Sequence, residues 1–159
     1  MNLDSAEFRR VLGHWASGVS VVTTRTPDGR PCGLTANAIS SLSLDPPLVL
    51  ACVDRAADTH DCIVSTGSFA ISILAHDAER IARLFSTDGS DRKFEGIAFR
   101  SEVTGAPVLD AALAWVDCTV HAQYDGGDHS IFIGRVVAAG AEDGTPLLYY
   151  RSGYGRFEP

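Results

Sequence analysis

Small polar side chains gather in one segment of the sequence, where they could hold a flat ligand. Residues 32–43 include Thr35, Asn37 and Ser41 and contain few bulky apolar side chains. Exposed backbone groups and hydroxyls on such a strand suit a flat heterocycle, and a helix start near Thr59 would suit a phosphate tail. Packing in a core does not explain this choice of residues, so the segment indicates either a binding site or an edge strand with a solvated face.

Other chemistries lack the motifs that they need. The sequence contains no G-x-S-x-G turn for a nucleophilic serine and no G-x-G-x-x-G turn for a doubly wound dinucleotide fold. The four cysteines are widely spaced without a C-x-x-C pair, which predicts buried thiols and no zinc site or disulfide framework. The five histidines have no H-x-x-x-H spacing, and we therefore expect no metal; they are His14, His60, His76, His121 and His129.

Composition excludes two further classes of protein. The 159 residues carry a formal net charge of -7, which argues against nucleic acid as the main partner. No apolar run approaches the roughly 18 to 20 residues needed to span a bilayer. Residues 1–7 have neither a basic nor an apolar stretch typical of a secretion signal, and we expect a cytoplasmic protein with a single domain over 1–159.

Short β-branched runs separated by turn residues predict a mainly β fold. A helix begins after Asp4, presents Phe8, Val11, Leu12 and Trp15 on one face, and is expected to end at Gly18. Turns at 26–29 and 125–128 indicate hairpins. The aromatic tail 151–157 is interpreted as either a lid over a ligand or a frayed end. Further strands are expected at 19–24, 48–53, 69–74, 115–124, 131–139 and 147–150, with helices at 60–65 and 77–85. About seven strands and two or three short capping helices favour a closed or nearly closed antiparallel barrel.

Several short segments, taken in order, resemble the flavin reductase family with the FMN-binding split-barrel fold. No one motif is decisive, but the ordered set covers residues 8–155. The matching segments are Gly-Val-Ser-Val-Val-Thr-Thr at 18–24, Gly-Leu-Thr-Ala-Asn-Ala at 33–38, residues 41–48 and 69–74, Arg-Lys-Phe at 92–94, residues 105–109, Gly-Asp-His at 127–129, and residues 133–136 and 146–149.

This resemblance implies a fold and an activity. The fold would be an antiparallel Greek-key split β-barrel, and the protein would be a homodimer with flavin between the protomers. The activity would be that of an NAD(P)H:flavin oxidoreductase, in which NADH or NADPH gives a hydride to FMN or FAD. Reduced flavin would then pass to a separate monooxygenase.

The resemblance also implies a set of site residues. His129 would lie beside the nicotinamide as the catalytic candidate, with Tyr154 as a second nicotinamide neighbour. Arg92 would place a cation near the phosphate or adenylate. The cofactor-binding residues would be Thr35, Ala36, Asn37, Ala38, Ser40 and Ser41 at the ring and ribityl chain, Cys52, Val53 and Asp54 along the ring, Thr59 and His60 at the phosphate, and Phe85, Arg92 and Phe94.

Two alternatives share the same barrel. The first is a non-catalytic FMN-binding electron carrier or redox sensor. The second is a flavin oxidase similar to pyridoxamine-phosphate oxidase, which would need a basic phosphate-binding set. The chain offers only 13 Lys and Arg residues, and they are not clustered.

Overall fold

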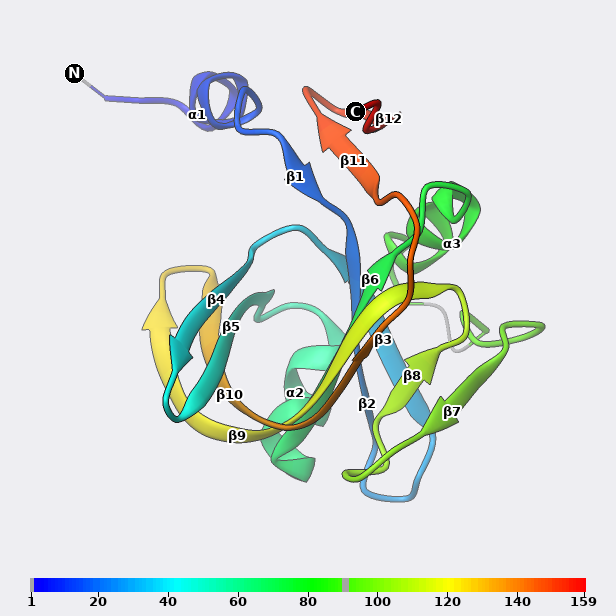
Figure 1. Cartoon of the computed structure of the whole chain (residues 1–159). Helices are drawn as coiled ribbons and strands as arrows, with labels where there is room; N and C mark the ends of the chain where they lie inside the picture. Colours follow the sequence, from blue (N-terminus) through cyan, green and yellow to red (C-terminus); the bar gives the residue numbers. More distant parts are fainter. Residues whose placement is uncertain (1, 90–91) are drawn as a thin grey trace.

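The computed structural model describes residues 2–89 and 92–159 and shows a strongly curled antiparallel sheet with short helices around it (Figure 1). The helices are α1 (Ser5–Leu12), α2 (Asp58–Thr66) and α3 (Glu79–Phe85). The main sheet contains β2 (Ser20–Arg25), β3 (Pro31–Ala36), β4 (Ile39–Leu44), β5 (Pro47–Asp54), β6 (Ser68–Leu74), β9 (Ala112–Gly126) and β10 (His129–Ala141). Two small sheets contain β1 (Ser17–Gly18), β11 (Leu147–Tyr150) and β12 (Gly153–Arg156), and β7 (Phe99–Ser101) and β8 (Pro107–Leu109).

The main sheet is a barrel with one open seam. Its strand order is β3-β2-β6-β9-β10-β5-β4, so β3 and β4 are the two edges. These two edge strands are consecutive in the chain and are joined at Asn37 and Ala38. The amide of Cys52 on β5 donates to the carbonyl of Ala38 (3.0 Å), which fixes this corner. The prediction of a mainly β, split antiparallel barrel with short capping helices is confirmed.

Strand β2 is buried on both faces and therefore belongs to two cores. Successive residues of a strand point to opposite sides. Val22 packs with Phe69 and Phe132 in one core, which draws on β2, β5, β6, β9, β10 and α2. Val21 packs with Phe85 in a second core, which draws on α3, β8 and β11. The second core holds α3 against the barrel wall that carries β3.

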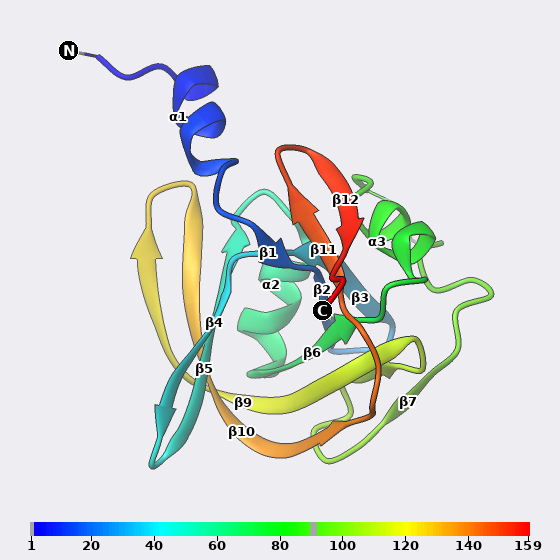
Figure 2. The ribbon, with the colours of Figure 1, turned by 45° about the horizontal axis from the view of Figure 1, so that its top comes forward.

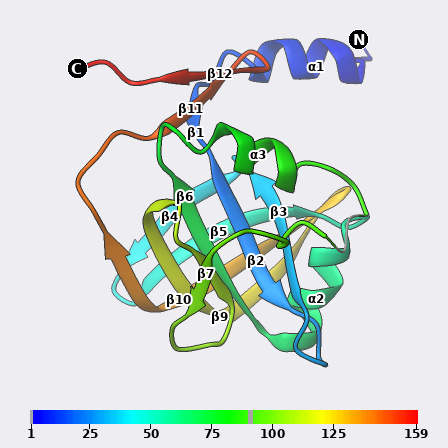
Figure 3. The ribbon, with the colours of Figure 1, turned by 90° about the vertical axis from the view of Figure 1, so that its right-hand side faces the viewer.

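The first and last parts of the chain form one small sheet at the top of the barrel (Figures 2 and 3). Strand β11 pairs with β1 on one side and with β12 on the other, so the tail is a hairpin rather than a frayed end. Its turn places Arg151 and Ser152 at positive φ (47° and 67°). The amide of Arg151 donates to the carbonyl of Gly13 (3.1 Å), so this hairpin holds the end of α1.

Helix α1 begins as predicted and ends earlier. Asp4 caps it by accepting the amide of Glu7 (2.7 Å). The helix stops at Leu12 because the next amides, of His14 and Trp15, donate to carbonyls only three residues back (3.1 and 3.0 Å). Gly18 lies in β1 and does not end the helix. The helix extends away from the barrel, and it has no buried residue (Figure 2).

The predicted hairpins are confirmed, whereas one small sheet was not anticipated. Gly127 and Asp128 join β9 to β10, and β2 and β3 meet around residues 26–30. Strands β7 and β8 lie in a segment expected to be loop.

None of the helices formed by residues 2–89 and 92–159 is both long and apolar enough to span a lipid bilayer.

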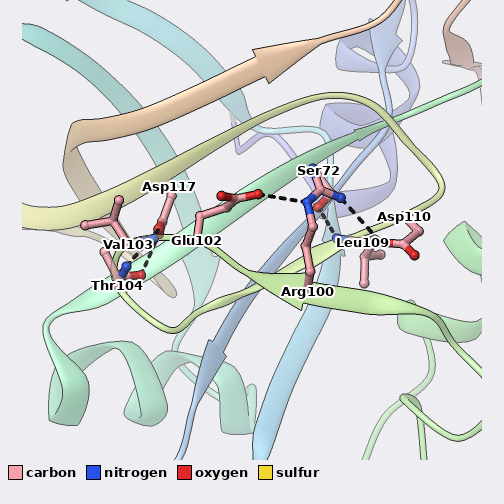
Figure 4. Close-up of polar contacts among 8 residues, drawn as sticks. All are labelled: Ser72, Arg100, Glu102, Val103, Thr104, Leu109, Asp110 and Asp117. Atoms are coloured by element: carbon pink, nitrogen blue, oxygen red, sulfur yellow. Dashed lines mark hydrogen bonds and ion pairs between the residues drawn. The ribbon is translucent and has the colours of Figure 1, made fainter.

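A buried carboxylate attaches the β7–β8 hairpin to the barrel. Asp117 on β9 is fully buried and accepts the backbone amides of Val103 and Thr104 (2.8 Å each) and the Thr104 hydroxyl (Figure 4). Ser72 on β6 accepts the amide of Leu109 (3.0 Å) in the same region. These bonds replace strand pairing, which the hairpin lacks toward the main sheet.

We expect Asp117→Asn to lower the free energy of unfolding by about 2–3 kcal/mol, because an amide nitrogen would then face backbone donors in a buried site. Urea unfolding followed by circular dichroism measures this loss. Asp110→Asn is the matched control, since Asp110 is exposed and contacts Arg100 at 3.3 Å, and it should change the value by less than about 0.5 kcal/mol. Equal effects of the two substitutions would contradict the assigned role of Asp117.

Candidate functional site

The open edge of β3 forms one wall of a cleft of about 680 Å³. The other walls are the corner 37–38, the end of β5, the start of α2, the segment after α3 and the start of β10. Strand β3 is paired only with β2 in the described part of the chain, so alternate backbone groups along it face away from the sheet. The cleft therefore has hydrogen-bond donors and acceptors built into its wall.

Ten of the predicted site residues line this cleft. They come from five separate segments, and the fold brings them together. These residues are Thr35, Ala36, Asn37, Ala38, Cys52, Asp54, Thr59, Phe85, Phe94 and His129.

Six predicted site residues lie outside the lining of this cleft. Ser40 and Ser41 are exposed on β4, beyond the corner that turns the chain away. Val53 is fully buried, because it faces the barrel interior between Cys52 and Asp54. The remaining three are His60, Arg92 and Tyr154, which are described below.

His60 points into the protein and not toward the cleft. Its Nε2 lies 2.8 Å from Ser130 Oγ, and its ring meets Phe132 edge-on at 5.3 Å. Its Nδ1 lies 3.1 Å from the Asp61 carboxylate. His60 thus attaches α2 to β10 and leaves Thr59, its neighbour, at the cleft.

A lysine next to Arg92 lines this cleft, as does Arg30. Arg92 is 82% exposed and lies 3.8 Å from the Glu95 carboxylate. Lys93 Nζ instead donates to the carbonyls of Gly33 (3.2 Å) and Phe85 (3.3 Å), and burial lowers the pKa of this amine. The Arg-Lys-Phe segment indicated a cation at the site, but only the three-dimensional structure shows that Lys93, and not Arg92, turns inward.

The aromatic wall depends on a glycine. A Cβ on Gly33 would lie 3.0 Å from the Phe85 ring and 3.2 Å from the Phe94 ring. These two rings meet edge-on at 5.0 Å, and Phe85 is buried in the second core. Phe85 and Phe94 therefore form a rigid wall beside β3.

The start of α2 is a second polar feature of the cleft. Ala57 occupies the N-cap position without any side-chain cap, and residues 56–59 line the cleft. The first amides of a helix have no acceptor within the helix and carry a partial positive charge. This nine-residue helix thus offers backbone donors that suit a phosphate group.

His129 is the first residue of β10 and lies opposite Asp54 in the strand register. Its Nδ1 donates to the Asp128 carboxylate (2.7 Å), and this bond lowers the pKa of Asp128. An ionised Asp128 holds the imidazole by Nδ1 and leaves Nε2 available to a ligand.

Three of the four cysteines also line the cleft, which the sequence did not indicate for Cys32 or Cys62. Burial, together with a hydrogen bond to the Cys62 thiol, raises the pKa of Cys32 to about 12. Burial also raises the pKa of Cys52. These thiols are therefore neutral at physiological pH and are not poised as nucleophiles.

A second, smaller pocket of about 310 Å³, here called the side pocket, adjoins the cleft. It shares Thr35, Asn37 and Ser86 with the cleft and extends to the β11–β12 hairpin. Tyr154 lies here, so the structure places it next to the cleft but not in it.

Within the described residues, no group of three or more His, Cys, Asp or Glu side chains could hold a metal ion.

Comparisons with known proteins identify the family of the chain. Residues 12–158 match the family model described as a flavin reductase like domain. The reductase component of a 4-nitrophenol 4-monooxygenase/4-nitrocatechol 2-monooxygenase from Rhodococcus opacus is 45% identical, over 99% of this chain and 83% of that protein. An FMN reductase (NADH) from Agrobacterium fabrum is 38% identical, over 97% of this chain and 87% of that protein.

A solved structure shows the same fold. The NADH:FAD oxidoreductase of Streptomyces globisporus, in complex with NAD and FAD fragments, superposes with a TM-score of 0.92 at 36% identity. The alignment covers 100% of this chain and 98% of that one. The chain therefore belongs to the flavin reductase family, and it is an oxidoreductase that acts on flavin.

We expect Cys32 to resist alkylation in the folded protein. With its pKa near 12, its thiolate fraction at pH 8 is about a thousandfold below that of an ordinary thiol. Iodoacetamide labelling followed by peptide mass spectrometry should show slow modification that accelerates up to about pH 12. Labelling in urea, where all four cysteines should react at similar rates, is the control; rapid labelling of native Cys32 at pH 7 would contradict the structure.

Proposed function

We propose that the cleft binds FMN or FAD and that the protein reduces this flavin with NADH, releasing reduced flavin to a separate monooxygenase. The observation that carries the proposal is the unpaired edge of β3, which faces the uncapped start of α2 across the cleft. Relatives that are reductase components of monooxygenases support the delivery step.

The donors and acceptors of the cleft fit a flavin. The ring edge presents both hydrogen-bond donors and acceptors, which the backbone of β3 and the amide of Asn37 can match. The start of α2 and Lys93 would bind the phosphate end, and the volume is that of a typical cofactor site. Bound flavin would supply a hydride acceptor at its N5.

The residues of the cleft act mainly by positioning. The Thr35 hydroxyl donates to the carbonyl of Ala82 (2.6 Å), so it fixes β3 against α3 and retains only acceptor capacity. The wall of Phe85 and Phe94 excludes water from one side of the cleft. His129, held by Asp128, would orient the nicotinamide carboxamide, so that the two rings stack at about 3 to 3.5 Å.

The first test is the absorbance at 340 nm of purified protein mixed with NADH or NADPH, with and without FMN or FAD. We expect NADH oxidation that requires added flavin. A yellow protein without turnover would indicate a flavin-binding electron carrier instead, and a colourless protein without turnover would overturn the proposal.

His129→Ala should raise the KM for NADH about tenfold or more and leave the Kd for flavin within about twofold, because one oriented hydrogen-bonding group is lost. Initial rates and flavin fluorescence titration measure the two constants. His121→Ala is the control, since His121 does not line the cleft. An unchanged KM for NADH would remove the assigned role of His129.

We further propose that the protein is a homodimer that uses α1. An eight-residue helix without buried residues is not stable by itself, and its apolar face needs a partner surface. Phe8 and Leu12 on this face are 53% and 51% exposed, and Trp15, just beyond the helix, is 79% exposed. The four cysteines are free, as is usual in a reducing compartment, which supports a cytoplasmic location.

The double variant Phe8→Ser, Leu12→Ser should be a folded monomer, because these side chains make little contact with their own chain. Light scattering coupled to size exclusion measures the mass, and wild type should have about twice the mass of one chain. Val103→Ser changes an equally exposed apolar residue on the β7–β8 hairpin and should leave the mass unchanged. A monomeric wild-type protein would contradict the proposal.

A further inference from the structure

The side pocket has the chemistry of a nucleoside site. Its two tyrosine rings, Tyr149 and Tyr154, meet edge-on at 5.3 Å and provide an aromatic surface for a base. Hydroxyls of Ser86 and Ser152 and the amide of Asn37 also line it and suit the hydroxyls of a ribose. Because it is continuous with the cleft, a dinucleotide in the cleft would reach it.

Arg83 is the charged residue among the described side chains that line the side pocket. Its guanidinium lies 4.9 Å from the centroid of the Tyr154 ring. A guanidinium in this position would be expected to bind a phosphate group, because it can donate two parallel hydrogen bonds.

The charge of Arg83 is already compensated. Its Nε and Nη2 both donate to the same oxygen of Glu79, one turn earlier on α3, at 2.9 and 2.7 Å. An incoming phosphate would have to displace this carboxylate or lie beside it. The pair is half exposed, so its net strength is modest and one substitution is enough to release the arginine.

We propose that the side pocket takes the adenosine half of NADH, and that Glu79 makes the enzyme select NADH over NADPH by occupying Arg83. NADPH differs from NADH by a phosphate on the 2′-oxygen of this adenosine. An acidic residue near that oxygen disfavours the phosphate, whereas a free arginine favours it. The inference rests on the proposed function, since it concerns the coenzyme of the same reaction.

The test compares kcat/KM for NADPH and for NADH in three variants. Glu79→Gln keeps the shape of the side chain and frees Arg83, and it should raise the NADPH/NADH ratio at least tenfold. Arg83→Gln leaves an uncompensated carboxylate and should lower the ratio below that of wild type. The double variant, neutral at both positions, should have an NADPH/NADH ratio between those of the two single variants.

The chain provides a matched control on α1. Glu7 and Arg10 form a similar exposed Glu–Arg pair outside both pockets, in which Arg10 Nε and Nη2 donate to the two carboxylate oxygens at 2.8 and 2.7 Å. Glu7→Gln should leave the NADPH/NADH ratio within about twofold of wild type.

A binding measurement gives a readout that does not depend on turnover. Calorimetric titration of flavin-free protein with 5′-AMP and with adenosine 2′,5′-bisphosphate isolates the contribution of the 2′-phosphate. We expect wild type to prefer 5′-AMP or to bind both equally. Glu79→Gln should bind the bisphosphate at least tenfold more tightly than wild type does, with an advantage that decreases as salt increases.

Two outcomes would overturn the inference while leaving the proposed function intact. One is a Glu79→Gln enzyme that oxidises NADH normally with an unchanged NADPH/NADH ratio. The other is a change in the preference for FAD over FMN without a change in coenzyme ratio, which would assign the side pocket to the adenosine of FAD. Failure of wild type to oxidise either coenzyme would instead overturn the proposed function itself.

Discussion

Among residues 2–89 and 92–159, no strand lies beside the outer edge of β3, and the backbone groups of this edge must therefore be satisfied in other ways. A barrel that closed completely would pair this edge with β4, but the chain between them turns at Asn37 and Ala38 and is tied to β5 instead. The seam that results is the space where a ligand can bind to main chain. Much of the recognition can thus come from the backbone, which explains why small side chains suffice along this strand.

Helix α3 keeps this edge open and divides the space beside it. One side of the helix presents Phe85 to Gly33, and its carbonyl at Ala82 holds the Thr35 hydroxyl. The other side presents Arg83 to the side pocket. The second core fixes α3 through Val21 and Leu109, so this helix is a rigid wall shared by both pockets. Different side chains of α3 line the two pockets.

Local signals in the sequence were sufficient for most strands and turns, whereas the resemblance to a family was needed for the full set of ten positions along the cleft. The hairpin at Gly127 was predictable because glycine tolerates its positive φ, and β5 because its apolar run is continuous. The direction in which a side chain points was not predictable where distant residues decide it. His60 turns inward because it forms a hydrogen bond with Ser130, far along the chain, and Lys93 turns inward because it donates to the carbonyl of Gly33 on β3.

Other differences between the expected and the observed structure also arise from contacts with residues far along the chain. Strands β7 and β8 are only three residues long each, and a buried carboxylate on β9 attaches their hairpin, so no local periodicity predicts them. Helix α1 ends at Leu12 although its apolar periodicity continues to Trp15, because the carbonyl of Gly13 accepts the amide of Arg151 on the distant β11–β12 hairpin. The assignment of flavin and nicotinamide to the cleft rests on family resemblance and on donor chemistry, and it is a prediction.

The pairing of β1 with β11 also has a consequence for the order of folding. Ser17 and Tyr149 are partners although more than 130 residues separate them, so this sheet closes one of the longest loops in the chain. All seven strands of the main sheet leave the ribosome before β11 and β12 do. A nascent chain can therefore form the strands that line the cleft first. The aromatic surface of Tyr149 and Tyr154 is added only when the final hairpin docks and Leu147 joins the second core, so the side pocket is the last part of this region to form.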